Sequence, residues 1–179
     1  VFNKNFSLGN FFELINDTAV TTAMIFLVLL GAEFFNSFIA LSRVTNILSE
    51  TILSYDYSPF AIVAIILVIY IFLGCLMDSL AMILLTIPVF FPVIIQLDFG
   101  MSVEETAIWF GILTLIVVEV GLITPPVGLN AFIINKIAGD IPIKETFKGV
   151  LPFLMSDFLR VTLLFLFPGI TLFLVRLLY

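Results

Sequence analysis

Long apolar runs, separated by short polar segments, organise this sequence of 179 residues. Residues 1–17 are mixed and polar and predict an interfacial lead-in, and Asp17 with Thr18 can cap the helix that follows. The apolar run from Thr18 to Leu41 is long enough to cross a bilayer, which takes about 20 residues. Residues 42–58 carry more polar side chains and predict a short amphipathic connector at the membrane surface.

The next apolar stretch is interrupted. Ser58-Pro59 favours a helix start, because proline at the first helical position loses no needed hydrogen bond. The apolar run over Phe60–Leu73 has only about 14 residues, which is short for a full span and suits a re-entrant arm. A second arm with two prolines is expected over Ser79–Leu97. Residues 58–97 therefore predict a helical hairpin that returns to the side it left.

A second interrupted segment follows the hairpin. An apolar run over Thr106–Ile123 stops at Thr124-Pro125-Pro126-Val127-Gly128 and resumes over Leu129–Ala138. Residues 103–138 therefore predict one transmembrane helix that is broken near its middle. At its start, Ser102-Val103-Glu104-Glu105 has the spacing of a capping box.

The remaining segments complete three expected parts. Gly139–Val150 is polar and amphipathic, and Leu151–Tyr179 predicts a last span. Interrupted membrane helices are typical of secondary transporters. We therefore expect an N-terminal part over residues 1–57, a transport part with both interruptions over 58–138, and a C-terminal part over 139–179.

Composition supports a membrane protein. Hydrophobic residues make up 62% and charged residues 11% of the sequence, and the mean hydropathy is +1.28. Soluble domains carry about 45–50% apolar and about 25% charged residues. The expected fold class is an all-α, multi-pass integral membrane protein with a re-entrant helical hairpin and a broken helix.

Several functions are excluded by residue types. The net charge of −6 leaves no basic stripe for nucleic acid. A single cysteine, Cys75, excludes a disulfide framework, and the absence of histidine excludes the usual zinc sites and histidine-based catalysis. We therefore expect neither an enzyme nor a cofactor.

Charges in the short loops predict an orientation. One side of the membrane receives four lysines and the other two arginines. These residues are Lys4, Lys136, Lys144 and Lys148 on the first side, and Arg43 and Arg176 on the second. By the positive-inside rule the lysine side is cytoplasmic, and the hairpin opens outward. Because the sequence starts at Val1 without a signal-peptide pattern, we expect a fragment of a longer protein.

The break contains the residues best suited to bind a cation. Pro125 and Pro126 lack the N–H groups that would pair with the carbonyls of Gly121 and Leu122. Thr124 precedes a proline and is disfavoured in the helical conformation. Freed carbonyls are tolerated at membrane depth where protein or a watery cavity satisfies them, and unwound helices in transporters use such groups to bind Na⁺.

The candidate cation ligands extend through the break. They are Gly121, Leu122, Thr124, Pro125, Pro126, Val127 and Gly128, with Na⁺ expected at Gly121, Thr124 and Gly128. The Thr124 hydroxyl and the Asn130 amide can add side-chain oxygens. The alternative is a purely structural kink, as many prolines in membrane helices produce.

The expected hairpin tip offers a second site. Gly74 permits a tight turn, and free amides at the start of the second arm favour an anion such as a substrate carboxylate. Carbonyls at the end of the first arm favour a cation instead. We therefore expect Gly74 and Asp78 to bind a cation. The expected substrate-binding residues are Gly74, Asp78, Ser79 and Asn130. In the alternative interpretation, Asp78 or Ser79 is simply a helix N-cap.

Isolated polar residues in the apolar runs have other expected roles. Glu33 and Asn36 share a face of the first span and predict a helix–helix contact. Glu119 precedes the break and could line a cavity or pack against another subunit. Asp157 lies three residues before Arg160, so the two are expected to neutralise each other.

The order of these motifs resembles the large membrane subunit of TRAP transporters, the DctM-like family. The resemblance extends from about Thr18 to the end of the chain. It rests on Gly74-x-x-x-Asp78, Pro88 and Pro92, Phe110-Gly111, Gly121-x-x-Thr124-Pro-Pro-Val-Gly128, and Pro152-Phe153.

The resemblance implies a function that composition alone does not give. Members are Na⁺-driven importers of organic acids such as C4-dicarboxylates or sialic acid, located in the bacterial inner membrane. Their partners are a small membrane subunit and a periplasmic solute-binding protein, and Na⁺ is the coupling ion. The large subunit has two inverted repeats and works by an elevator motion, and this chain is similar to the second repeat.

Two segments of this chain match functional parts of the family. Gly74–Asp78 matches the outer hairpin tip, and Thr124–Gly128 matches the unwound region that binds one Na⁺. The first repeat, which supplies the rest of the site, has no counterpart in these residues. Alternatives are an ion-coupled carboxylate carrier without a binding protein, a structural membrane subunit, or, disfavoured by the residue types, a membrane-embedded enzyme.

Overall fold

The computed structural model describes residues 8–55, 57–139 and 141–178, and these residues form eight α-helices without a strand. The helices are α1 (Leu8–Ser42), α2 (Val44–Ser54), α3 (Pro59–Gly74), α4 (Ser79–Ile94), α5 (Val103–Ile123), α6 (Leu129–Ala138), α7 (Ile143–Leu166) and α8 (Pro168–Leu178). The expected all-α class is confirmed.

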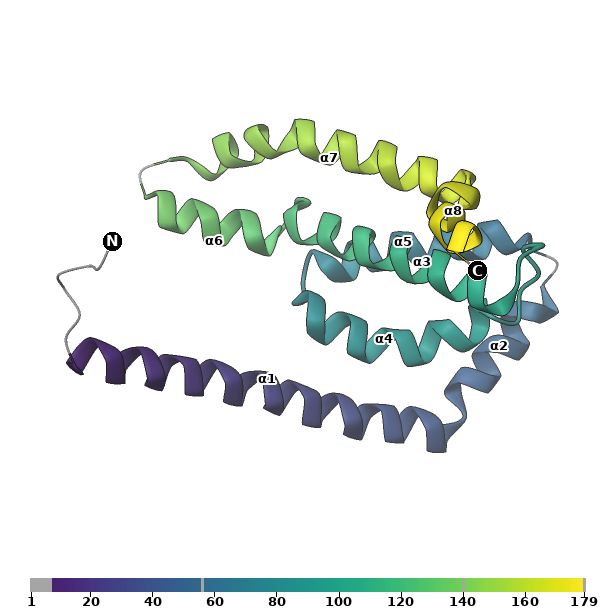
Figure 1. Ribbon diagram of the computed structural model, residues 1–179, viewed down its shortest axis with the longest axis horizontal. Helices are drawn as coiled ribbons and strands as arrows, with labels where there is room; N and C mark the ends of the chain where they lie inside the picture. Colours follow the sequence, from purple (N-terminus) through teal and green to yellow (C-terminus); the bar gives the residue numbers. More distant parts are fainter. Residues whose placement is uncertain (1–7, 56, 140, 179) are drawn as a thin grey trace.

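The helices lie roughly side by side in an elongated bundle. In Figure 1, α1 forms one long edge, α6 and α7 form the opposite edge, and α3, α4 and α5 lie between them. Helix α2 connects the end of α1 to the hairpin and packs on α4. Three helices, α1, α5 and α7, are long and apolar enough to cross a membrane.

The hairpin and the first half of the broken helix form the buried centre. Helix α3 is apolar on all sides and packs along α5 with one face, while the opposite face, with Ile65, Val68 and Phe72, is exposed. Tyr70 of α3 is fully buried, and its hydroxyl lies 2.9 Å from Thr86 Oγ1 of α4, which ties the two arms together. With 16 residues each, α3 and α4 have the short lengths expected of re-entrant arms.

The expected non-helical lead-in to the first span is wrong within the described residues. Helix α1 begins at Leu8, so Asp17 and Thr18 lie inside it and do not cap its start. The Thr18 hydroxyl donates to the Leu14 carbonyl at 2.7 Å, and the Thr21 hydroxyl donates to the Asp17 carbonyl at 2.8 Å. Polar side chains here bond back to their own helix, so a polar sequence does not interrupt it.

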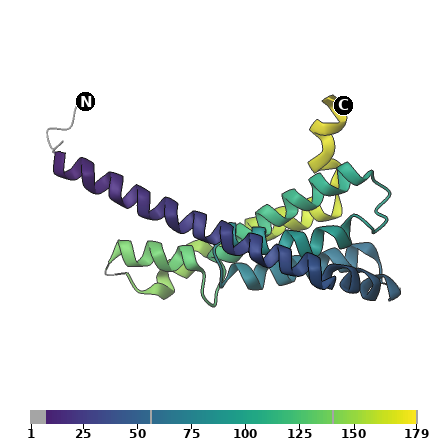
Figure 2. The same cartoon turned by 90° about the horizontal axis from the view of Figure 1, so that it is seen from below.

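Most of α1 has no protein contact among the described residues. Its two buried residues are Ala32 and Ile39, near its C-terminal end. Figure 2 shows the N-terminal half standing clear of the other helices. At 1.5 Å per residue the helix is about 52 Å long, well beyond the ~30 Å of a hydrocarbon core. Residues 1–7 of the expected lead-in lie outside the described residues.

The last expected span is also corrected, because it is two helices. Helix α7 begins at Ile143, within the segment expected to be a connector, and ends at Leu166. Phe167 leaves the helical region with φ −125° and ψ 73°, as a residue before proline tends to do. Pro168 then starts α8 in a new direction. Its missing N–H would have paired with the carbonyl of Leu164.

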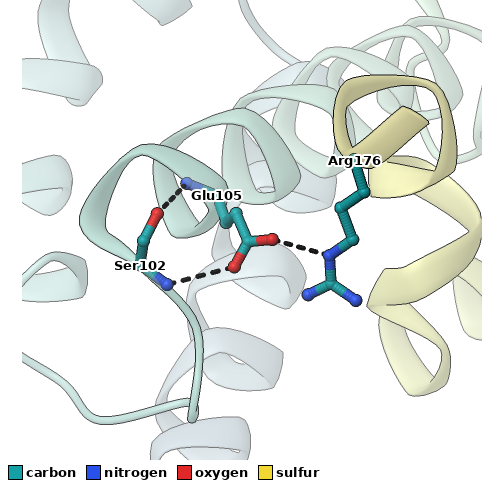
Figure 3. A network of polar contacts seen from close by, with 3 residues as sticks. All are labelled: Ser102, Glu105 and Arg176. Carbon is teal, nitrogen blue, oxygen red and sulfur yellow. Dashed lines mark hydrogen bonds and ion pairs between the residues drawn. The ribbon is translucent and has the colours of Figure 1, made fainter. Parts of the chain in front are cut away.

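An ion pair attaches α8 to the start of α5. Arg176 Nε donates to Glu105 Oε1 at 2.6 Å. Figure 3 shows that the same Glu105 carboxylate also accepts the Ser102 N–H, completing the capping box predicted from the sequence. Glu105 therefore joins two elements that are 71 residues apart in the chain.

Candidate functional site

The hairpin tip and the helix break, predicted as separate features, lie against each other. A Cβ atom added to Gly121 would lie 2.7 Å from the Cα of Gly74, and one added to Gly74 would lie 3.0 Å from the Cα of Gly121. Real Cβ atoms essentially never approach backbone as closely as 2.7 Å, so position 121 requires glycine, and at position 74 a Cβ would be tighter than nine in ten real Cβ contacts. The two glycines therefore allow the end of α3 to touch the end of α5 directly.

Cys75 extends this contact into the break. Its thiol lies 3.5 Å from the carbonyl oxygen of Thr124 and 3.9 Å from that of Pro125. The side chain is 3% exposed. A thiol is a weak donor, so these carbonyls keep most of their capacity to bind another group. Sequence reasoning did not assign Cys75 to the site, and its place directly after Gly74 was the available signal.

Thr124 ends α5 by returning both of its donors to the helix. Its N–H donates to the Gly121 carbonyl at 3.0 Å, and its hydroxyl donates to the Val120 carbonyl at 2.5 Å. Its backbone is extended, with φ −87° and ψ 133°, as predicted for a residue before proline. Because Pro125 has no N–H, the Gly121 carbonyl was expected to be unpaired. It is paired, because the N–H of Thr124 donates to it.

Several carbonyl oxygens at the break accept no strong hydrogen bond from an amide of the described residues. The Leu122 carbonyl would pair with residue 126, but Pro126 has no N–H, and no loop or cap amide of the described residues replaces it. The Cys75 thiol lies near the carbonyls of Thr124 and Pro125, and the Thr124 carbonyl also faces Gly128 across the turn of residues 125–127. The Thr124 hydroxyl donates its hydrogen and keeps lone pairs for a cation. The Pro125–Pro126 peptide bond is cis.

Gly128 closes the break and starts α6. It has φ 57° and ψ 69°, in the left-handed region that favours glycine, and no side chain caps the helix. Its carbonyl already accepts the Phe132 N–H at 3.0 Å. A Cβ here would lie 3.0 Å from the Phe147 ring of α7 and 3.2 Å from the Thr124 carbonyl oxygen. Phe147 is a further residue at the break that the sequence did not indicate.

The first turn of α6 offers donors rather than acceptors. The first amides of a helix have no partner within it, and the helix dipole gives this end a partial positive charge. Asn130, the second residue of α6, is half-buried, as is Val127 before it, whereas Pro126 is exposed. The break thus places the carbonyl end of α5 next to the amide end of α6.

At the tip, the N-cap interpretation of Asp78 is the one that the structure shows. Asp78 Oδ2 accepts the N–H of Leu80 at 3.1 Å and that of Ala81 at 3.2 Å. Two of the amides considered for a substrate carboxylate are thus already bonded to a carboxylate of the chain. Ser79 is half-buried and Asp78 is exposed.

The isolated polar residues have roles outside this site. Arg160 and Asp157 form the expected ion pair at 2.8 Å. Asn36 makes the expected helix contact through the carbonyl of Leu84 on α4, whereas Glu33 is exposed. Glu119 is exposed as well. Among the described residues, no group of three or more His, Cys, Asp or Glu side chains is arranged to hold a metal ion.

Comparison with known proteins gives one consistent family. The model of the family described as "Tripartite ATP-independent periplasmic transporter, DctM component" matches residues 1–170. The sialic acid TRAP transporter large permease protein of Vibrio cholerae is 30% identical over 166 residues, which cover 93% of this chain and 37% of that protein.

Two further relatives are named for sialic acid and for C4-dicarboxylates. The sialic acid TRAP transporter permease protein of Haemophilus influenzae is 28% identical over 98% of this chain and 27% of its own length. The C4-dicarboxylate TRAP transporter large permease protein of Pseudomonas aeruginosa is 26% identical over 84% of this chain and 34% of its own length. The chain thus spans well under half the length of these curated relatives.

Proposed function

The chain belongs to the DctM component family of tripartite ATP-independent periplasmic transporters, and from this we propose that it is part of a Na⁺-driven importer of organic acids. Its relatives are transporter permeases and not enzymes. In this proposal it works in the bacterial inner membrane with a small membrane subunit. A periplasmic solute-binding protein delivers the substrate.

The observation that carries the proposal is the contact between the hairpin tip and the helix break. Gly74 and Gly121 bring the end of α3 against the end of α5, where Leu122, Thr124 and Pro125 offer carbonyl oxygens without strong donors. An unpaired acceptor away from water costs about 1–3 kcal/mol. A dehydrated Na⁺ ion recovers that free energy at several oxygens at once, so we assign the coupling ion to this place.

In this proposal, Na⁺ and the negatively charged substrate bind to different groups of the site. Acceptor oxygens at the end of α5 suit Na⁺, and the uncapped amides at the start of α6 suit a carboxylate. We assign the substrate carboxylate to these amides and to Asn130 in the same turn, with Ser79 at the start of α4 as the contribution of the hairpin tip. A carboxylate at the tip repels an anion, so we assign Asp78 to the cation and not to the substrate.

The substrate class follows from the relatives only in general terms. Their names include sialic acid and C4-dicarboxylates, which share a carboxylate group. We propose an organic acid of this kind for the complete transporter. Because the chain covers 37% of the Vibrio relative, residues beyond those described here are needed to complete both ion and substrate sites.

The test is uptake by the complete transporter in proteoliposomes, with and without its solute-binding protein. Uptake that requires an inward Na⁺ gradient and the added binding protein, and that sialic acid or a C4-dicarboxylate inhibits, supports the proposal. Na⁺-driven uptake without the binding protein indicates an ordinary ion-coupled carboxylate carrier. Uptake that ignores the Na⁺ gradient contradicts the proposal.

A further inference from the structure

The direction of α6 depends on few contacts, because the break separates this helix from α5. Residues 124–128 form no helix, so the direction of α5 does not determine that of α6. Among the described residues, α6 packs on no helix except α5 and α7. Figure 1 shows α6 and α7 together along one edge of the bundle. The angle between α5 and α6 therefore depends on α7 and on the conformation of the break.

Beside the break, the contact between α6 and α7 is aromatic. A Cβ added to Gly128 would lie 3.0 Å from the Phe147 ring of α7, so the ring lies directly against the main chain at the end of the break. The same ring packs edge-to-face against Phe132 of α6, with 6.3 Å between the ring centroids. Gly128 and Phe132 are four residues apart, so Phe147 covers one face of the first turn of α6.

Near the turn that joins α6 to α7, the contact is polar. Asn135 of α6 donates through Nδ2 to the Ile141 carbonyl at 2.7 Å and to Thr146 Oγ1 at 2.8 Å. Thr146 directly precedes Phe147, so these bonds hold the turn of α7 that carries the ring. Asn135 follows Gly128 by seven residues, about two helical turns. Two contacts at this separation fix the direction of α6 along α7.

The two ends of the break are thus held by different elements. The hairpin tip covers the carbonyl end of α5, where Gly74 meets Gly121. Phe147 of α7 covers the amide end of α6, which carries Asn130. Loss of the Phe147 ring would free the start of α6 and leave the contact between Gly74 and Gly121 in place. A shift of α6 therefore disturbs the groups assigned to the substrate more than those assigned to Na⁺.

We propose that Phe147 is a positioning residue for the substrate, which holds the amide end of α6 beside the carbonyl end of α5, while Asn135 keeps the ring in place. The inference rests on the proposed function in assigning the substrate carboxylate to the start of α6. A merely structural role would lower stability and leave the affinities for Na⁺ and substrate unchanged. A positioning role changes the placement of α6 and the affinity for the substrate.

The first test measures where α6 lies and does not require transport. In the complete transporter, with Cys75 and all other cysteines replaced, spin labels are attached at Leu115→Cys on α5 and Ile137→Cys on α6, two exposed positions. Pulsed electron paramagnetic resonance gives the distribution of distances between the labels. This distribution should become broader or shift in Phe147→Ala and in Asn135→Asp, because aspartate keeps the shape of asparagine but has no N–H to donate.

The second test measures substrate and ion separately. Loss of an aromatic pair corresponds to about a fivefold change in an equilibrium. At saturating Na⁺, the half-saturating concentration of sialic acid, or of succinate as a C4-dicarboxylate, should rise by about that factor in Phe147→Ala. The rise in unfolding midpoint that Na⁺ causes without substrate should match that of the original protein. Adding Asn135→Asp to Phe147→Ala should not increase the effect, because Asn135 acts through the ring.

The controls separate this contact from general loosening of α7. Leu159→Ala shortens an exposed apolar side chain of the same helix and should match the original protein in both tests. If Phe147→Ala does not reach the membrane, Asn135→Asp and Phe147→Leu, which keeps part of the apolar volume, should show smaller changes of the same kind.

Three results would overturn the proposal. They are unchanged label distances in the Phe147 and Asn135 variants, changed distances with an unchanged half-saturating acid concentration, and equal losses of Na⁺ and substrate affinity. If the original transporter takes up neither acid, the proposed function is contradicted instead. The label distances then still decide whether Phe147 positions α6, so the two failures are distinguishable.

Discussion

The two ends of α5 satisfy their polar groups in opposite ways. At the start, Ser102 and Glu105 exchange hydrogen bonds, and Glu105 also pairs with Arg176. At the end, Thr124 closes part of the helix, but the Leu122 carbonyl keeps no N–H partner among the described residues. One end is completed by side chains of the chain, and the other leaves oxygens for a ligand.

The surroundings explain why the difference matters. Ser102 is exposed, so any group left unpaired at that end can bond to water. Gly121 and Leu122 at the other end are buried, and the hairpin tip covers them. Open acceptors are therefore costly at the break and inexpensive at the start.

The largest effect is expected from Gly121→Ala, which tests the contact that buries the break. The new Cβ would meet backbone atoms of Gly74 at 2.7 Å and the Ile71 carbonyl oxygen at 3.0 Å, and backbone cannot move aside easily. We expect a loss of about 1–3 kcal/mol of stability and loss of Na⁺-driven uptake. Gly111→Ala on the same helix is the control, because nothing lies within 4 Å of its Cβ. Equal behaviour of the two variants would show that the close approach is unimportant.

The next largest effect concerns the hydroxyl at the break. Thr124→Ala removes a candidate ligand and the bond to the Val120 carbonyl, whereas Thr124→Ser keeps both. We expect the Na⁺ concentration for half-maximal uptake to rise about fivefold or more in the alanine variant and little in the serine variant. A lower maximal rate with an unchanged Na⁺ requirement in Thr124→Ala would point to a structural kink.

A smaller effect is expected at the closed end. Ser102→Ala removes the hydroxyl that accepts the Glu105 N–H at 3.1 Å. Loss of an N-cap costs about 0.5–2 kcal/mol, so the unfolding midpoint of the complete transporter should fall. Its half-saturating Na⁺ concentration should not change, since this end holds no ligand. A changed half-saturating Na⁺ concentration in Ser102→Ala would contradict the proposed difference between the two ends of α5.

The smallest effect is expected for Arg176→Gln. The Arg176 guanidinium and the Glu105 carboxylate are partly exposed, so salt screens their attraction. We expect a slight fall in the unfolding midpoint at low salt that disappears at high salt, with Na⁺-driven uptake retained. A loss that persists at high salt would mean that packing of α8, and not charge, attaches it to α5.

The interrupted segments were predictable because their signals are local. Short apolar runs beside Gly74 and the paired prolines at Pro125 and Pro126 mark the ends of α3 and α5 whatever their neighbours are. The Asp78 cap and the Ser102 capping box likewise depend on residues two or three positions apart. Such features need no knowledge of the tertiary structure.

The errors came where a residue's role depends on what lies next to it. The start of α1 was missed because Thr18 and Thr21 bond to their own helix, which a polar sequence does not reveal. The Gly121 carbonyl was expected to be free, but the Thr124 N–H donates to it, three residues earlier in the chain. The part played by Cys75 depends on the approach of two glycine-containing helices, and no local pattern encodes it.

Stabilisation by Na⁺ tests the central claim most directly, because an ion that binds the folded protein raises the unfolding midpoint further as its concentration exceeds its Kd. The measurement is the unfolding midpoint of the complete transporter against Na⁺ concentration, with K⁺ keeping ionic strength constant, for the original protein, Thr124→Ala and Ser102→Ala. We predict that Ser102→Ala starts lower but gains as much from Na⁺ as the original protein. Thr124→Ala should gain less and need more Na⁺. Identical Na⁺ titrations of all three proteins would contradict a Na⁺ site at the break.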